Sequence, residues 1–292
     1  MTRRIIFYLA IIVFFAISYV VLLYAQGYKY SFSDRRFIRT GAIYLNVNTN
    51  AHVLLDGQMV QTTSFIANTA SIDTLLPGTY TVGVQKEGYS VWQKKVTVME
   101  GFVQDFSHVL ILPQTDPDQE NIRREIQNLL HPPIPSPTLP ILSPTPSGLQ
   151  NRGSSIPQSN SKSNLRGIGI KLLPNPSPTP DTTAPYFLNG KLLYVQGENG
   201  PTQIATNVTA VVRSDDGRKI AWIADKQIWV YWLSDTDYQP IHHAGDIILL
   251  SRSIYPVKAL VWFKDSDHLA LDADGLKIIE IDTRGGTNII NF

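Results

Sequence analysis

The chain has 292 residues and a formal net charge of +1, with 25 Lys and Arg against 24 Asp and Glu. Such a balance gives no electrostatic case for nucleic-acid binding, which usually requires a clustered basic face. The absence of cysteine excludes disulfides, thiolate metal sites and a cysteine nucleophile. The length is sufficient for about two domains with additional segments.

The first predicted element is a membrane-spanning helix at residues 5–25, preceded by a short tail of residues 1–4. Residues 5–24 contain neither a charge nor a proline. A helix of this length, at about 1.5 Å per residue, crosses the roughly 30 Å hydrocarbon layer of a bilayer. The alternative is a cleaved signal peptide, but Leu23-Tyr24-Ala25 is a poor match to the small residues of a cleavage site. We therefore expect an uncleaved anchor that contacts the lipid bilayer through residues 5–24.

The charges that flank this span conflict with the orientation that we favour. Two basic residues precede the span and a larger set follows it; these are Arg3 and Arg4, and then Lys29, Arg35, Arg36 and Arg39. The positive-inside rule therefore favours a cytoplasmic location for the C-terminal side. We nevertheless expect the C-terminal domains to be extracellular, for a reason that the next segment provides.

Residues 41–113 predict a small β-sandwich. Short alternating runs, bounded by Gly, Pro, Asn or Asp, lie at 42–47, 52–55, 78–84 and 89–98. Runs of this kind are typical of several antiparallel strands in a sandwich.

The aromatic residues of this segment are expected to supply much of its core, because a domain of this size has little buried area. They are Tyr80, Tyr89 and Trp92. In the last run, Val91, Val96 and Val98 form the expected buried set. Lys94 and Lys95 are expected to lie beside that set.

The same segment resembles a PEGA domain. The family's strand-turn, central turn, second strand and aromatic segment appear in order as Ala51, Val53, Leu55-Asp56-Gly57, Pro77-Gly78, Tyr80, Val82, Val84, Gly88-Tyr89 and Trp92. Residues 61–64 depart from the family, in which a Gly-x-Thr-Pro turn often follows the first motif. The resemblance implies a location on the outer surface of a bacterial cell, often behind a membrane anchor, and implies no defined activity.

Residues 114–185 predict a linker rich in Pro, Ser and Thr. Residues 113–185 hold 15 of the 19 prolines. An extended spacer of this kind, at about 3.1 Å per residue, would hold the last domain on the order of 100 Å from the first. A short amphipathic helix is expected at 118–130, where Ile122 and Ile126 share a face. It either docks on the preceding domain or a partner, or remains solvated.

Residues 186–292 predict propeller-like β repeats. Ile220-Ala221-Trp222 matches Leu269-Ala270-Leu271 at an offset of 49, and a period near 40–50 is typical of propeller blades. The first copy resembles TolB-like and WD-type propellers through Ser214, Asp216, Gly217, Ile220, Ala221 and Trp222.

About two blades fit into this segment, with a leading strand at 191–195, whereas a closed propeller needs roughly 4–8 blades. We therefore expect an incomplete propeller. We hypothesise that the sequence is a truncated form of a longer protein. The alternative is a two-blade stack that closes by oligomerisation.

No residue is predicted to be catalytic, to bind a cofactor or to hold a metal. Tyr89 and Trp92 could stack on a sugar ring, but their strand positions favour the core. Asp56 precedes Gly57 and is expected in a turn rather than at a metal. The sequence contains no P-loop, nucleophile elbow or zinc-protease motif.

Three further patterns have structural interpretations. His242 and His243 could hold a metal with Asp246, but neighbours in a strand point to opposite faces. Asp272-Ala273-Asp274-Gly275 begins like a calcium loop but lacks its closing Glu, which favours a tight turn. Asn207-Val208-Thr209 fits a glycosylation sequon, which matters only in a eukaryotic secretory pathway.

The sequence thus predicts a mainly β, single-pass membrane protein with an anchor, a PEGA-like sandwich, a linker and a partial propeller. The expected function is non-catalytic binding or scaffolding at the cell surface, with cell-wall polysaccharide or surface proteins as partners and no cofactor. One alternative is a cytoplasm-facing membrane scaffold or sensor. The other is a truncated propeller-containing hydrolase.

Overall fold

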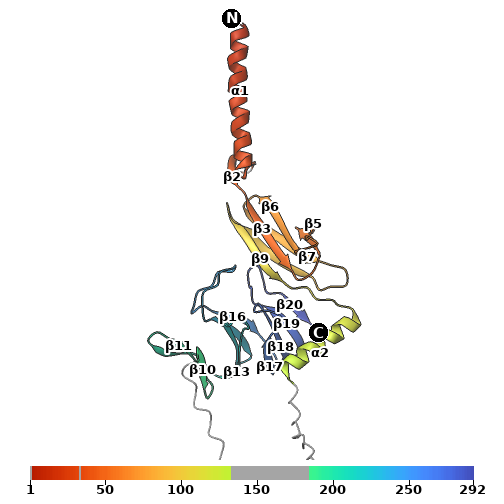
Figure 1. The fold of residues 1–292 in the computed structure, drawn as a ribbon, viewed down its shortest axis with the longest axis vertical. Coiled ribbons are helices and arrows are strands. Elements are labelled where there is room, and N and C mark those ends of the chain that lie inside the picture. Colours follow the sequence, from red (N-terminus) through yellow and green to blue (C-terminus); the bar gives the residue numbers. More distant parts are fainter. Residues whose placement is uncertain (1, 33, 133–183) are drawn as a thin grey trace, which may run out of the picture.

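The computed structural model describes residues 2–32, 34–132 and 184–292, and this part of the chain is mainly β (Figure 1). Helix α1 (Thr2–Ala25) extends away from the sheets as a straight rod. From Ile5 to Tyr24 it is apolar on all sides, and none of its apolar window is buried. A helix with no polar stripe and no protein around it is suited to a lipid environment. Its length and composition suffice to cross a membrane, and a signal sequence near an N-terminus has the same properties.

A hairpin that the sequence did not predict connects α1 to the sheets. Its strands are β1 (Tyr28–Ser31) and β2 (Arg36–Arg39), which pair antiparallel. The hairpin is closed at its base because both the backbone nitrogen and the hydroxyl of Thr40 donate hydrogen bonds of 2.8 Å to the Gly27 carbonyl.

Two sheets packed face to face follow the hairpin. One has the order β6-β3-β9 and the other β5-β4-β7-β8. Their bounds are β3 (Gly41–Val47), β4 (His52–Leu55), β5 (Gln58–Thr62), β6 (Thr69–Leu75), β7 (Gly78–Gln85), β8 (Trp92–Val98) and β9 (Val103–Val109). Both sheets contribute to one hydrophobic core, to which every strand of the sandwich except β5 supplies buried side chains. We call this unit the sandwich.

The sandwich has the several antiparallel strands that the sequence predicts, and in addition β9 pairs parallel with β3. Val96 and Val98 are buried as expected, but the expectation for Val91 was wrong, since Val91 precedes β8 and is 60% exposed. The residues that point inward from β8 are Trp92, Lys94, Val96 and Val98. Lys94 thus occupies a core-facing position, where its alternation with apolar residues places it.

The C-terminal residues form three antiparallel meander sheets, which we call the C-terminal unit. They are β10 (Tyr186–Asn189), β11 (Leu192–Gly197) and β12 (Gly200–Ala205); β13 (Val208–Arg213), β14 (Lys219–Ala224), β15 (Gln227–Trp232) and β16 (Ile247–Arg252); and β17 (Ala259–Trp262), β18 (His268–Ala273), β19 (Gly275–Glu280) and β20 (Ile289–Asn291). The two copies of the sequence repeat are the second strands of the two four-stranded sheets. The sheet of β10, β11 and β12 has three strands, whereas the sequence predicted only one leading strand at 191–195.

The three sheets lie in a stack, because separate hydrophobic cores join the first to the second and the second to the third. Strand β14 is buried along its whole length, as expected of a strand with both faces covered. The described residues show no closed ring of sheets.

Helix α2 (Asp116–Leu130) covers the outer face of the last sheet in the stack. Its buried residues Ile122 and Ile126 pack with Phe263, Ala270 and Ile278. The amphipathic helix therefore docks on the C-terminal unit and not on the preceding sandwich. Its apolar face covers sheet surface that would otherwise contact water.

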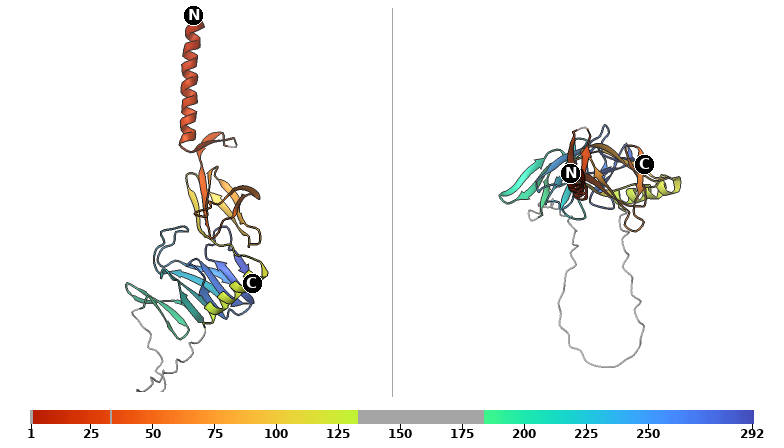
Figure 2. Two further views of the ribbon diagram at one scale, coloured as in Figure 1. Left: turned by 45° about the vertical axis from the view of Figure 1, so that its right-hand side comes forward. Right: turned by 90° about the horizontal axis from the view of Figure 1, so that it is seen from above.

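The C-terminal unit also packs directly against the sandwich (Figures 1 and 2). The expected separation on the order of 100 Å was therefore wrong. The side chains of Trp92 and Glu280, which are 188 positions apart in the sequence, form a hydrogen bond of 3.2 Å. Residues 133–183, which hold most of the predicted linker, lie outside the described residues.

Candidate functional site

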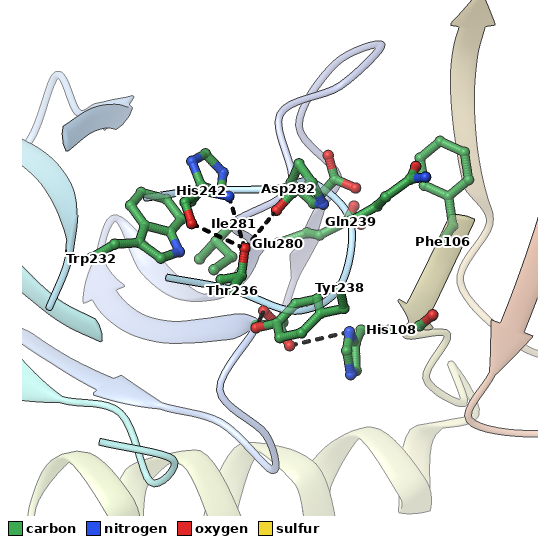
Figure 3. Close-up of a pocket in the computed structure, with 13 residues that line it drawn as sticks. Phe106, His108, Trp232, Thr236, Tyr238, Gln239, His242, Glu280, Ile281 and Asp282 are labelled. Carbon is green, nitrogen blue, oxygen red and sulfur yellow. Dashed lines mark hydrogen bonds and ion pairs between the residues drawn. The ribbon is translucent and has the colours of Figure 1, made fainter. Parts of the chain in front are cut away.

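A narrow cavity lies between the sandwich and the C-terminal unit, and we call its surroundings the junction. The cavity volume is about 20 Å³, which is room for about one water molecule. Figure 3 shows that the lining side chains come from the end of β9, from the segment after β15 and from the end of β19. The lining residues are Phe106, Ser107, His108, Trp232, Thr236, Tyr238, Gln239, Pro240, His242, Asp267, Glu280, Ile281 and Asp282.

Lys94 reaches the junction from the sandwich. Because it lies at an inward position near the open edge of β8, its side chain extends to the C-terminal unit and is completely buried. Its ammonium nitrogen lies 3.2 Å from a Glu280 carboxylate oxygen and 3.7 Å from an Asp282 carboxylate oxygen. It also donates a hydrogen bond to the Asp282 carbonyl. A fully buried ammonium requires such partners, because an unpaired charge in the interior is very costly.

Glu280 receives further hydrogen bonds at the end of β19. Trp92 Nε1 donates to its carboxylate at 3.2 Å and Asn288 Nδ2 donates at 2.8 Å. Burial raises the pKa of Glu280 above its ordinary value, against the opposing effect of the Lys94 charge. The carboxylate is thus held by three donors, two of which come from β8.

Arg284 joins the same cluster from the other side. Its guanidinium donates to the Asp282 carboxylate at 2.7 Å, to the Asp105 carbonyl at 2.6 Å and to Gln239 Oε1 at 2.9 Å. It also lies over the Phe106 ring, with 4.3 Å between the guanidinium carbon and the ring centroid. The planar guanidinium suits this position because it has several donors and a face that stacks on an aromatic ring.

The junction also covers the open edges of the sandwich. β8 and β9 are edge strands of the two sheets, and an uncovered edge exposes unpaired backbone groups. The Lys95 backbone nitrogen donates to the Gly285 carbonyl at 3.3 Å, and that of Asp105 donates to Gln239 Oε1 at 3.1 Å. In return, Gln239 Nε2 donates to the Val103 carbonyl at 2.9 Å.

A second buried charge cluster lies within the C-terminal unit and borders the cavity through Tyr238 and Asp267. The completely buried Lys219 donates to the Tyr238 hydroxyl at 2.6 Å and to Asp267 Oδ1 at 3.2 Å. Tyr238 in turn donates to Asp267 Oδ1 at 3.0 Å, and His108 Nδ1 lies 3.2 Å from Asp267 Oδ2. Burial first, and then the Asp267 charge, raise the pKa of Tyr238. The phenol therefore stays protonated and acts as a hydrogen-bond donor.

This chemistry is suited to holding two units together. Lys94 of the sandwich pairs with Glu280 and Asp282 across the junction, and the cavity beside them has only the volume of a water molecule. Buried ion pairs of this kind have strict geometric requirements, so they favour one relative orientation of the partners. The junction therefore joins the sandwich directly to the C-terminal unit.

The histidine pair falls at the rim of this site. His242 and His243 lie in a loop between β15 and β16, and not in a strand. His242 stacks on Trp232 with 3.7 Å between ring centroids, and its Nδ1 lies 3.2 Å from Asp246 Oδ2. His243 turns away toward Asp235 at 3.5 Å. Within the described ranges, no group of three or more His, Asp or Glu side chains has a geometry that could hold a metal ion.

The aromatic and acidic residues singled out in the sandwich have structural positions. Trp92 is 1% exposed and Tyr89 packs against the same core, so neither presents a free ring face to a sugar. Asp56 has a positive φ of 50° and its carboxylate accepts the Thr81 backbone nitrogen at 2.7 Å. This is the geometry of a turn residue.

Two further patterns lie in turns of the C-terminal unit. Gly275 has a φ of 85° and opens β19 directly after Asp274, in a tight turn. Asn207 also has a positive φ, and its side-chain amide donates to Asp225 at 3.0 Å.

Sequence reasoning missed the residues that form the junction. The signal for Lys94 was its alternation with Trp92, Val96 and Val98, which places a lysine on an apolar face. Lys219 had a similar signal, since it begins a strand that is otherwise wholly apolar. Their acidic partners had no local signal, because they lie far away in the sequence or in loops.

Comparison with known proteins gives no family for this chain. No family model and no curated protein matches it. A protein from Lactobacillus plantarum with a crystal structure is similar over 82% of each chain, at 12% identity and a TM-score of 0.25. A likeness at this level carries no argument about fold or function.

Proposed function

We propose that this protein is a non-catalytic, membrane-anchored scaffold that holds a rigid, two-part β-structure at the bacterial cell surface. The observation that carries the proposal is the junction, in which the buried Lys94 of the sandwich pairs with Glu280 and Asp282 of the C-terminal unit. Helix α1 supplies the anchor, since its exposed surface is apolar on all sides. A chain of this form presents the loops of its C-terminal unit at a fixed place relative to the membrane.

The resemblance of residues 41–113 to PEGA domains supports the extracellular location, and the blade-like repeats of residues 186–292 support a binding role. Cell-wall polysaccharide or surface proteins are the proposed partners. A cytoplasm-facing scaffold is the second candidate, because four basic residues directly follow α1: Lys29, Arg35, Arg36 and Arg39. The truncated hydrolase is less well supported, since the polar groups around the cavity bind one another.

The experiment that tests the location uses the absence of cysteine from the native chain. Asn199→Cys places a single thiol in the exposed turn between β11 and β12, and Thr2→Cys places one on the opposite side of α1. Intact cells are treated with a membrane-impermeant maleimide. We expect Asn199→Cys to be labelled and Thr2→Cys to remain unlabelled. The reverse pattern would establish the cytoplasm-facing scaffold instead.

The binding role is tested separately with purified peptidoglycan. The detergent-solubilised full chain is mixed with peptidoglycan sacculi, which are then sedimented. We expect retention that is lost in the presence of excess soluble cell-wall fragments. Recovery of all protein in the supernatant would exclude the polysaccharide and leave surface proteins as the proposed partners.

A further inference from the structure

The hairpin of β1 and β2 has a place in the fold that the scaffold function does not explain. It lies between the end of α1 and the start of the sandwich, and Figure 2 shows it projecting sideways across the axis of α1. If α1 crosses a bilayer, an element in this position lies parallel to the membrane surface. The apolar run of α1 ends at Tyr24, so the hairpin begins within one helical turn of the hydrocarbon boundary.

One face of the hairpin is aromatic. The strand register pairs Tyr30 with Phe37, and their ring centroids lie 5.4 Å apart. Phe32 extends the cluster at 5.2 Å from Tyr30, and Tyr24 of α1 joins it at 6.3 Å from Phe37. Phe32 is 87% exposed. Tyrosine and other aromatic rings gather at membrane interfaces, where an apolar ring meets the polar headgroups.

The hairpin is also strongly basic. Residues 28–39 contain one acidic residue, Asp34, and four basic residues: Lys29, Arg35, Arg36 and Arg39. The whole chain carries a net charge of only +1, so positive charge is concentrated beside the anchor. Arg35 and Arg36 are exposed. Basic residues next to a membrane helix are attracted to anionic lipid headgroups.

The hairpin is held in this position by the protein itself. Thr40 closes its base through two hydrogen bonds to Gly27. The Arg39 backbone nitrogen donates to Glu100 Oε1 at 3.1 Å, which ties the hairpin to the turn between β8 and β9. The protein therefore holds the aromatic and basic groups in place, so that contact with a surface would need no additional ordering of the hairpin backbone.

We propose that this hairpin is a second membrane-binding element, which inserts its aromatic face into the interface and binds anionic phospholipid headgroups through Arg35 and Arg36 beside its tip. The inference rests on the proposed anchorage by α1. The element sets the angle between the anchor and the sandwich, because a flat hairpin contacts the surface along its length. The partner is the lipid surface on the same side as the sandwich.

The test places a fluorescent reporter in the full-length protein. Phe32→Cys carries an environment-sensitive fluorophore, and the chain is reconstituted into vesicles of phosphatidylcholine with or without phosphatidylglycerol. Phe65→Cys is the matched control, because Phe65 is 90% exposed in the loop between β5 and β6. We expect the label at position 32 to be quenched by headgroup-labelled lipids, more strongly with phosphatidylglycerol. The label at position 65 should stay unquenched.

The charges are tested by Arg35→Gln/Arg36→Gln in the Phe32→Cys background. Each charge removed should lower the ratio of membrane-bound to unbound hairpin, at a given phosphatidylglycerol content, by about fivefold. Correct folding is checked by tryptophan emission, since all five tryptophans lie outside the hairpin.

Two outcomes would overturn the proposal, and they are distinguishable from a failure of the anchor. If the protein floats with the vesicles but position 32 behaves like position 65, the hairpin does not bind the membrane and the anchor stands. If quenching is the same in both lipid compositions, the headgroup part of the proposal is wrong. A protein that does not float with the vesicles would overturn the proposed anchorage and the hairpin together.

Discussion

At the scale of single residues, the junction depends on a lysine on the apolar face of a strand. Lys94 has no exposed side-chain surface and is balanced by Glu280 and Asp282. Its position is unfavourable unless those partners are present, because a buried ammonium has lost its hydration. The stability that the junction provides therefore comes mainly from the interaction of Lys94 with its acidic partners, and not from either side alone.

The first prediction concerns this coupling. Lys94→Met and Glu280→Gln should each lower the free energy of unfolding by about 3 kcal/mol, because each leaves a buried group without its partner. The double variant should lose less than the sum, with an interaction energy of more than about 1 kcal/mol. Chemical denaturation of all four proteins measures it.

The control for this cycle is the exposed pair Glu120 and Arg124 on α2, whose charged atoms lie 4.0 Å apart. Its interaction energy should be no more than about 0.5 kcal/mol. If the Lys94 and Glu280 effects simply add, then Lys94 is held by Asp282 and not by Glu280.

The second prediction concerns pH. Burial lowers the pKa of His242, against the opposing effect of Asp246. The unfolded chain therefore binds a proton at this residue more readily than the folded chain does, with an ordinary pKa of about 6.5. The neutral His242 ring therefore stabilises the folded chain at pH values above the unfolded-state pKa. This stabilisation is lost as the pH falls below that pKa and toward the lower pKa of the folded state.

His242→Gln should therefore flatten the decrease in stability between about pH 7 and pH 5. The measurement is the free energy of unfolding at several pH values. His243→Gln is the matched control, because its side chain is 72% exposed whereas that of His242 is 18% exposed. Equal slopes for His242→Gln and the parent protein would mean that protonation of this ring is not coupled to folding.

At the scale of elements, the loop between β19 and β20 forms the other half of the junction. Gly285 has a φ of 64°, and a Cβ placed there would lie 2.8 Å from the Lys95 backbone nitrogen and closer still to the Lys95 carbonyl oxygen. The loop thus lies directly on the backbone of β8. Only glycine permits this approach, because backbone atoms cannot move aside as a flexible side chain can.

The third prediction compares two neighbouring glycines. Gly286 also has a positive φ, of 110°, but a Cβ there would meet no atom within 4 Å. Gly285→Ala and Gly286→Ala therefore share the conformational strain, and only the first adds a collision with β8. Gly285→Ala should lower the free energy of unfolding by about 1–3 kcal/mol more than Gly286→Ala. Equal costs in thermal or chemical unfolding would show that the loop does not need its close contact with β8.

The elements that sequence reasoning predicted are those with a local pattern. An uninterrupted apolar run predicted α1, and alternation of apolar and polar residues predicted β3 and β7. The sequence repeat predicted that β14 and β18 are equivalent strands of two similar sheets. The hairpin β1–β2 was not expected, because each of its strands has only four residues.

The candidate site was not predictable in the same way. Its contacts join residues that are as many as 188 positions apart, as Trp92 and Glu280 are. No periodicity within a strand indicates which distant carboxylate meets Lys94. Parallel pairing of β3 with β9 was missed for the same reason, since it depends on where the chain crosses from one sheet to the other.

At the scale of the whole molecule, the structure replaces two tethered domains with one continuous body. The expected spacer would have left the sandwich and the C-terminal unit to move independently. Instead, β8 and β9 are covered by the C-terminal unit, and α2 is packed on the last sheet of the stack. The proposed scaffold thus has a defined shape from the end of α1 to the outermost sheet.

The last prediction follows from this continuity. Because the buried Lys94 of the sandwich has its acidic partners in the C-terminal unit, the two units should unfold together, in one calorimetric transition of the detergent-solubilised chain. Arg284→Ala removes the guanidinium that holds Asp282, Asp105 and Gln239, and it should split or broaden that transition. Arg252→Ala, at an exposed position at the end of β16, should leave it single. Two transitions in the parent protein would mean that the junction only brings together units that are stable on their own, and the rigid scaffold would then be the wrong description.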